Sequence, residues 1–415
     1  MRFFALLSGL LGCLPISTRA FKHPGLLHTA DDFTRITQKV NSNAEPWKTG
    51  WTKLISNSHA ASTYVPSPQA TVYRGTLSGA TYKENYSKLF NDAAAAYALA
   101  VRWKVSGGAV YADAAKAILD GWAKNLTYID GTSDKYLASG IYGYQLANAA
   151  EILRTYSGWP ASSFKMLVTM LHNVFYSMNH AFLVNHNGAK IDHYWANWDL
   201  ANIATMQAIG ILSDNVTMYN EAVNYFKTGA GNGAITKMIW KLYTEEGSKK
   251  ELAQGQEAGR DQGHTMLDFA LLGVIAQQSY NQGDDLFGYL DNRILAGYVS
   301  SFSWFYDPEL TDPSSAEYAA KYNLGHDVPY TSYTNSDVTH AVLSNNSRGE
   351  IRPAWELLYA HYGVLKGLNT SWTEQYRDLV VKSGSGAEGG GGNYGPNSGG
   401  FDQLGYGTLL YRLDA

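Results

Sequence analysis

The densest group of chemically active side chains lies between Gln256 and His264, where two carboxylates, an arginine and a histidine occur within nine residues. Arg260 and His264 are four residues apart, so a helix would place them on one face, and Glu257 and Asp261 share this spacing. An apolar run begins directly afterwards. Burying such polar groups is costly unless they bind one another or a ligand. The segment therefore predicts either an ion network at a helix entry or a site for an anionic substrate.

A second group of polar side chains lies at the start of another expected helix, from His193 through Tyr194, Asn197 and Trp198 to Asp199. Tyr194 and Asn197 are three residues apart, so both can project from the same side of the first helical turn. An asparagine here could simply cap the helix, and a tryptophan could belong to the core. A cap alone, however, rarely needs a histidine, a tyrosine and an asparagine together.

A third group consists of two amides in an otherwise small and apolar stretch. Gln145 and Asn148 follow Tyr142 and Tyr144 near the start of a further expected helix. Buried amides need hydrogen-bond partners, so these two either bind neighbouring loops or reach a ligand.

Asparagine, histidine, tyrosine and arginine together suit the β-elimination of a uronic acid polymer. Neutralising the uronate carboxylate with an amide or a guanidinium stabilises the enolate that forms when the C5 proton leaves. A histidine or tyrosine removes that proton, and a tyrosine or histidine protonates the departing O4. No metal or cofactor is required. The catalytic candidates are Asn197, His193, Tyr194, Arg260 and His264. The substrate-binding candidates are Gln145, Asn148, Trp198, Gln262, Tyr142 and Arg348.

Two other functions fit the same residues. A glycoside hydrolase would use a pair of carboxylates. The candidates for that pair are Glu257, Asp261, Asp199 and Asp268. A non-catalytic protein could instead use the amides and aromatic rings only to bind sugar. The chain has no Gly-x-Ser-x-Gly elbow, no phosphate-binding GxxxxGK[ST] loop and no HExxH zinc motif.

The elements that must position these groups are helices, because apolar residues recur at helical spacing along most of the chain. Many of these helices are apolar on two sides, which places them between neighbours. Pairs of helices joined by short turns predict an all-α fold, an incomplete α/α toroid of helical hairpins in a single domain. The expected helices are Tyr86–Val105, Val110–Asn125, Gly143–Tyr156, Ser162–Phe182, Trp195–Leu212, Val216–Gly229, Ile235–Tyr243, His264–Gln282, Leu286–Phe305, Ala354–Leu365 and Trp372–Lys382.

The first 20 residues have the pattern of a secretory signal peptide, with a basic start, a short apolar core and small residues before Ala20. The single cysteine, Cys13, lies in that segment, so the domain from 21 to 415 is expected to have no disulfide. Five Asn-x-Ser/Thr sequons predict N-glycosylation of an extracellular protein. They are at Asn85, Asn125, Asn215, Asn345 and Asn369.

Charge and composition narrow the class of partner. The net charge is −4 without a basic block, which argues against nucleic-acid binding, and no long apolar segment predicts a membrane span. The 30 tyrosines and 11 tryptophans suit sugar binding as well as core packing. Residues 384–407 are glycine-rich, yet their asparagine, tyrosine and phenylalanine side chains favour an ordered loop near a cleft. We expect a monomer acting on a polyuronate.

The chain also resembles the alginate lyase-like polysaccharide lyases, which have an α/α toroid. The resemblance extends over nearly all of the chain after the signal segment. The stretches that carry it are Gly140–Glu151, His193–Asp199, Glu257–His264, Asp291–Arg293, Lys321–Gly325, Arg348–Pro353 and Gly389–Leu404.

This resemblance implies roles for particular residues. The Asn197-Trp198 pair matches one whose asparagine neutralises the substrate carboxylate, and Arg260 and His264 match the arginine and histidine of such sites. No motif fixes the tyrosine, for which Tyr194 is the first choice. The others are Tyr142, Tyr298 and Tyr322. Better-known alginate lyases have Asn-His before Tyr-Trp, where this chain has Asp192-His193, so His193 and His264 both remain candidates for the catalytic histidine.

Overall fold

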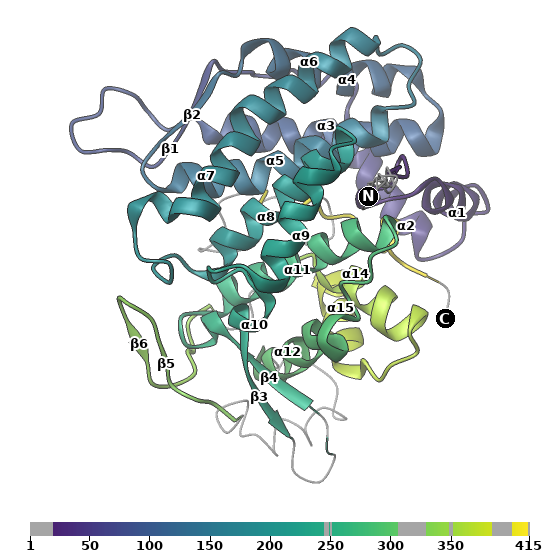
Figure 1. The fold of residues 1–415 in the computed structure, drawn as a ribbon. Helices are drawn as coiled ribbons and strands as arrows, with labels where there is room; N and C mark the ends of the chain where they lie inside the picture. The colour runs from purple at the N-terminus through teal and green to yellow at the C-terminus, as the bar shows by residue number, and fades with distance from the viewer. Residues whose placement is uncertain are drawn as a thin grey trace, which may run out of the picture.

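The computed structural model describes residues 20–244, 249, 251–305, 329–347, 352–383 and 401–413. Four long helices form the centre of the fold, and each packs against the next (Figure 1). They are α3 (Tyr86–Ser106), α5 (Asp134–Leu153), α8 (Ala196–Leu212) and α11 (Gln262–Asn281). Every residue of α8 except Trp198 is buried, as expected for a helix enclosed by neighbours.

A second layer of helices covers this centre. After α3, α5 and α8 the chain returns along an outer helix, which confirms the predicted toroid of helical hairpins (Figure 1). The outer segments after α3, α5 and α8 are α4 (Ala109–Asn125), then α6 (Ala161–Met170), the π-helix Leu171–Tyr176 and α7 (Ser177–Asn185), then α9 (Val216–Thr228). The later helices are α12 (Tyr289–Phe305), α14 (Trp355–Tyr359), the π-helix Ala360–Leu365, α15 (Ser371–Ser383) and α16 (Gly407–Leu410).

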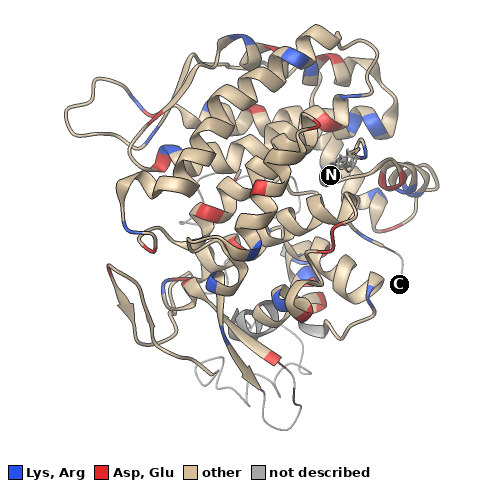
Figure 2. Ribbon diagram, in the orientation of Figure 1, with Lys and Arg blue, Asp and Glu red and all other residues tan. Residues whose placement is uncertain are grey.

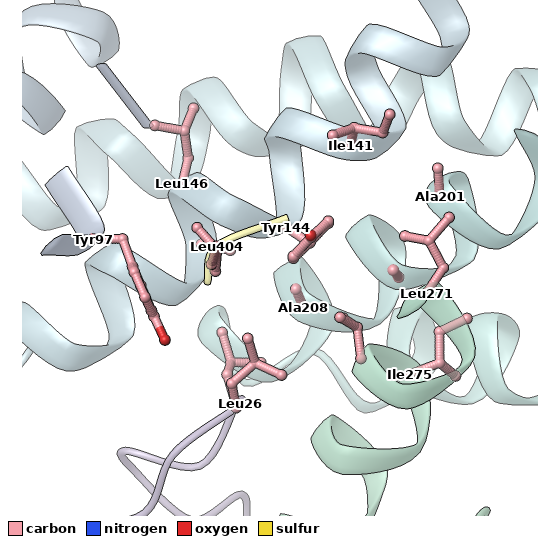
Figure 3. Packing of buried hydrophobic residues seen from close by; sticks show 14 of the residues in the cluster. Leu26, Tyr97, Ile141, Tyr144, Leu146, Ala201, Ala208, Leu271, Ile275 and Leu404 are labelled. Carbon is pink, nitrogen blue, oxygen red and sulfur yellow. The ribbon is translucent and has the colours of Figure 1, made fainter. Parts of the chain in front are cut away.

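The inner helices run in the same direction, so their N-terminal ends meet at one end of the toroid. Thr205 of α8 donates to the Gly140 carbonyl of α5, and at the other end Arg154 donates to the Leu212 carbonyl. The hydrophobic core lies between these helices, and Ile141, Ala208 and Leu271 belong to this one buried cluster (Figure 3). The end at which the helices begin also carries the polar groups around His193–Asp199 and Gln256–His264.

Helix α5, which was expected to begin at Gly143, begins at Asp134 instead. Its glycines lie within the helix because α5 and α8 approach each other closely. A Cβ at Gly140 would lie 2.7 Å from the Ala201 backbone, and one at Gly143 would lie 2.5 Å from Thr205. These glycines therefore belong inside the helix, where they let the two backbones pack closely.

The short elements lie around the toroid. At its N-terminus are α1 (Ala30–Asn41), α2 (Trp47–Ser56) and the 3-10 turn Ser58–Ala60. Strands β1 (Thr71–Arg74) and β2 (Tyr128–Gly131) pair in parallel. The antiparallel pairs are β3 (Ile239–Thr244) with β4 (Glu251–Gly255), and β5 (Tyr333–Thr334) with β6 (Thr339–His340).

One predicted helix, Ile235–Tyr243, is wrong. The helix α10 spans only Ile235–Met238, and the chain continues as β3, whose residues pair with β4. Ile239, Trp240 and Tyr243 are β-branched or aromatic, and such side chains suit a strand. The partner strand is a separate segment of the chain, so helical spacing within 235–243 carries no sign of it.

Residues 1–19, and with them the predicted signal segment, lie outside the described residues, as does most of the glycine-rich segment. The part from 401 onward is buried beside α5, where Tyr144 donates to the Asp402 carbonyl at 3.2 Å. Within the described residues, no helix is long and apolar enough to cross a membrane. Acidic and basic side chains are interspersed rather than gathered by sign (Figure 2).

Candidate active site

The candidate site lies where α8 and α11 begin. Trp195 precedes the first turn of α8, and the 3-10 turn Gln256–Gly259 leads from β4 into α11. Asp261 is the N-cap of α11 and accepts the His264 backbone N–H at 2.8 Å. The β5–β6 hairpin reaches this end as well, since Ser344, just after β6, donates its N–H to the Ala258 carbonyl at 3.1 Å.

Arg260 is held by a buried carboxylate. Its Nη1 donates to Glu257 Oε2 at 2.6 Å, and the Glu257 side chain is fully buried. The other Glu257 oxygen accepts two bonds from Asn197, 2.5 Å from its Nδ2 and 3.3 Å from its backbone nitrogen. The guanidinium lies 5.2 Å from the Trp195 ring centroid, and about a quarter of the Arg260 side chain is exposed. Glu257 thus fixes the orientation of the guanidinium while part of the group stays open to solvent, as an anion-binding group must be.

His264 is oriented by its own helix cap. Its Nδ1 lies 2.6 Å from Asp261 Oδ2, and the same oxygen is 3.7 Å from Arg260 Nε. Burial raises the pKa of Asp261, but the bond and charge of His264, together with Arg260, hold that pKa below its usual value. Asp261 is therefore ionised at neutral pH and directs the Nε2 atom of His264 away from itself. A fifth of the His264 side chain is exposed.

The β5–β6 hairpin adds residues that sequence reasoning missed. The ring of His340 lies 5.5 Å from that of Trp195, and the Tyr333 ring lies 6.0 Å from it. Gln256 Nε2 donates to the Tyr333 hydroxyl at 2.6 Å, and Tyr330 donates to the His340 carbonyl at 3.0 Å. No motif surrounds these residues in the sequence. They reach the site only because the hairpin folds back over the turn before α11.

The environment of His340 favours an uncharged ring. Burial, and then the positive charge of Arg260, lower the pKa of His340 against the opposing charges of Glu257 and Asp261. Burial raises the pKa of Tyr333 to about 12, so its hydroxyl keeps its proton at neutral pH. The site thus combines a cation, a neutral imidazole and protonated tyrosines.

His193 and Tyr194 lie beside this site, but they point in different directions. The His193 ring is exposed, and its Nδ1 bonds Asp337 in the β5–β6 turn at 2.7 Å. Tyr194 is buried against Phe182, and its hydroxyl accepts from Asn187 Nδ2 at 3.1 Å. The geometry favours a structural role for His193, which links the segment before α8 to the β5–β6 hairpin. The catalytic roles expected for both residues remain predictions.

Two further candidates are buried at the base of the site. Asn197 is fully buried, and its amide N–H bonds Glu257. Asn197 therefore helps to position the Glu257 carboxylate, which in turn binds Arg260. Gln262 is fully buried too, and its backbone N–H donates to the Asn346 carbonyl at 3.0 Å. Trp198 is partly exposed, and its ring lies tilted against the Tyr194 ring with centroids 4.8 Å apart.

The amides of α5 are engaged within the protein. Gln145 Nε2 donates to the Phe401 carbonyl at 2.7 Å. Asn148 accepts from the Leu27 N–H at 3.0 Å and donates to the Tyr144 carbonyl at 2.8 Å. Tyr142 is fully buried. These contacts favour packing roles for residues that were expected to bind substrate. Arg348, Tyr322 and the side chain of Tyr298 lie outside the described residues.

The four carboxylates of the hydrolase alternative are all buried. Asp199 bonds His186 Nε2 at 3.1 Å and the Gly233 N–H at 3.0 Å. Burial, and then the neighbouring Glu257, hold the pKa of Asp268 well above its usual value. Glu257 and Asp261 are bound to Arg260 and His264 as described above. Among the described residues, no group of three histidine, cysteine, aspartate or glutamate side chains could hold a metal ion.

Comparison with known proteins identifies the family and the fold. Residues 36–297 match the alginate lyase family. The fold is similar to alginate lyase A1-III from Sphingomonas species A1, with a TM-score of 0.54 and 15% identity over 85% of this chain and 92% of that one. An alginate lyase from Bacteroides ovatus gives a TM-score of 0.54 and 12% identity over 94% of this chain and 100% of that one. No curated protein sequence matches. The chain belongs to the alginate lyase family and is a polysaccharide lyase.

Proposed function

We propose that the chain cleaves a polyuronate, such as alginate or glucuronan, by β-elimination at the site around Arg260. The observation that carries this proposal is the position of Arg260, which is anchored by buried Glu257, lies over the Trp195 ring, is partly open to solvent and acts electrostatically on His340. A fixed guanidinium is suited to a carboxylate, and the aromatic ring beneath it is suited to a sugar.

In this reaction Arg260 binds the carboxylate of the uronate and stabilises the charge that develops when C5 loses its proton. An imidazole nitrogen accepts that proton, and His264 Nε2 is our first candidate because Asp261 fixes its ring. The C5–H electron pair forms the C4=C5 double bond while the C4–O4 bond breaks. The departing O4 takes a proton from a tyrosine, for which Tyr333 is our candidate because it remains protonated.

The comparisons support the substrate class. The similar structures are alginate lyases, and one of them, a variant of alginate lyase A1-III, was solved with a tetrasaccharide. It has a TM-score of 0.56 and 15% identity over 86% of this chain and 94% of that one. A polymer with a carboxylate on every unit also fits a site whose exposed cation is held by two buried carboxylate anchors, Glu257 and Asp261.

Incubation with a panel of polyuronates tests the proposal. A lyase produces an unsaturated uronate with new ultraviolet absorbance, whereas a hydrolase releases reducing ends without it. We expect absorbance with at least one polyuronate and none with its carboxyl-reduced form. Reducing ends without absorbance, or equal cleavage of the carboxyl-reduced polymer, would contradict the proposal.

We also propose that the chain is exported after cleavage behind Ala20 and acts as a glycosylated monomer. Three of the sequon asparagines are exposed: Asn125, Asn345 and Asn369. Asn85 instead uses its amide to bond the Thr71 carbonyl at 3.0 Å, and Asn215 caps α9. Mass spectrometry of the secreted protein should find an N-terminal Phe21 and sugar at one or more of the exposed sequons.

A further inference from the structure

Asp268 is a fully buried carboxyl group next to the candidate active site, and the reaction described above does not use it. It lies in the second turn of α11, four residues after His264 and seven after the N-cap Asp261, so the helix places all three on one face. Neither oxygen of Asp268 accepts a hydrogen bond within the described part of the chain. An ionised carboxylate in this position would have lost its hydration without gaining a donor, which is highly unfavourable.

The nearest partner for Asp268 is another buried carboxyl group. The Glu257 side chain is fully buried and lies within hydrogen-bonding reach of Asp268. Two ionised carboxylates can only accept, so a hydrogen bond between them requires one proton. Burial, and then the charge of Glu257, raise the pKa of Asp268 well above its usual value against the opposing charge of Arg260. The two carboxyl groups therefore hold one proton between them.

The surrounding donors decide which of the two groups carries this proton. Glu257 accepts from Arg260 Nη1 at 2.6 Å, and from the side-chain and backbone nitrogens of Asn197 at 2.5 and 3.3 Å. Three donors favour the ionised form of Glu257, whereas Asp268 receives no such bond among the described residues. The proton therefore belongs to Asp268, whose hydroxyl can donate to Glu257.

We propose that Asp268 is a positioning residue of the lyase reaction, a neutral carboxylic acid that donates to Glu257 and so holds the carboxylate that anchors Arg260. This inference rests on the proposed role of Arg260 in binding the uronate. The proton also limits the negative charge of the site. Glu257 and Asp261 already place two carboxylates beside the guanidinium, and an ionised Asp268 would add a third where an anion must bind.

Infrared spectroscopy tests the proton directly, because the C=O stretch of a carboxylic acid is distinct from the bands of a carboxylate. We expect an acid band in the wild type at neutral pH that is lost in Asp268→Asn. Asp92→Asn is the matched control and should keep this band, because Asp92 is also buried but accepts from Tyr64 and Trp122 instead. Acid bands that are identical in the wild type and Asp268→Asn would overturn the proposal.

Two substitutions of Asp268 test its effect on the reaction. Asp268→Leu has a similar volume but no donor, and its kcat/KM on a polyuronate should fall roughly tenfold or more. Asp268→Asn keeps an N–H that can donate to Glu257, so it should recover most of that loss. Equal kcat/KM values in the two variants would overturn the proposal. The infrared comparison gives its answer whether or not Asp268→Leu folds.

A double-mutant cycle with Arg260→Lys separates positioning from simple packing. If Asp268 acts through Glu257 on Arg260, the lysine substitution should cost clearly less in Asp268→Leu than in the wild type, because the anchor is already loosened. Losses that are independent of one another would overturn the positioning role. A wild type that cleaves no polyuronate would instead contradict the proposed function, and the infrared comparison would still decide whether Asp268 carries a proton.

Discussion

At the scale of single residues, Arg260 distinguishes the proposed chemistry from a purely structural ion network. Arg260→Lys keeps the positive charge but loses the planar fork that bonds Glu257 and lies over Trp195. We expect kcat/KM on a polyuronate to fall by roughly a hundredfold. Arg102→Lys is a matched control, because that arginine also stacks on an aromatic ring, 4.0 Å from Tyr111. Equal activity of both variants would favour the structural network.

His340 gives a second prediction at this scale. Burial and the charge of Arg260 lower its pKa from the usual 6.5, so the ring stays neutral as the pH falls through 6.5. Nuclear magnetic resonance titration should find the midpoint of His340 below 6.5. In Arg260→Gln the midpoint should rise, because a repelling charge is removed while Glu257 and Asp261 remain. A midpoint that does not change would show that Arg260 does not act on this ring.

At the scale of elements, the contact between α5 and α8 depends on glycines. A Cβ at Gly140 would lie 2.7 Å from the Ala201 backbone, which has little freedom to move. Gly140→Ala should therefore lower the free energy of unfolding by about 1–3 kcal/mol, measured by chemical denaturation. Gly121→Ala is the control, since its Cβ would approach only the Pro68 ring at 3.3 Å in the outer helix α4. We expect that variant to change stability by less than about 1 kcal/mol.

The helices could be predicted from the sequence alone, whereas some strands and site residues could not. Helical spacing predicted the toroid, because the periodic apolar residues of α3, α8 and α11 are local information. The pairing of Arg260 with Glu257 was one form of the ion network expected at this helix entry, because the two residues lie close together on one segment. The pairing of His264 with Asp261 was not predicted. Strand β3 and residue His340 could not be predicted in this way. Both depend on contacts with residues distant in the chain, and pattern alone does not contain those contacts.

At the scale of the whole molecule, the N-terminal segment joins the ends of three inner helices. His23 Nδ1 lies 2.6 Å from Glu151 near the end of α5, and its Nε2 lies 3.0 Å from Asp214 after α8. Gln282, the C-cap of α11, accepts the Lys22 N–H at 2.9 Å and donates to the Gly25 carbonyl at 2.6 Å. The toroid is therefore closed, at the end away from the candidate active site, by residues that follow the predicted cleavage point.

This closure predicts a pH-dependent stability. Burial lowers the pKa of His23, but the bond and charge of Glu151 and the bond of Asp214 outweigh it, so the folded-state pKa is raised above 6.5. The protonated histidine therefore stabilises the fold fully below pH 6.5, and this contribution is lost as the pH rises through the raised value. The melting temperature should decline over that range in the wild type and decline less in His23→Gln. His180→Gln, which alters an exposed histidine paired with Glu221, is the control and should follow the wild type. An identical decline in all three proteins would mean that His23 does not couple the closure of the toroid to pH.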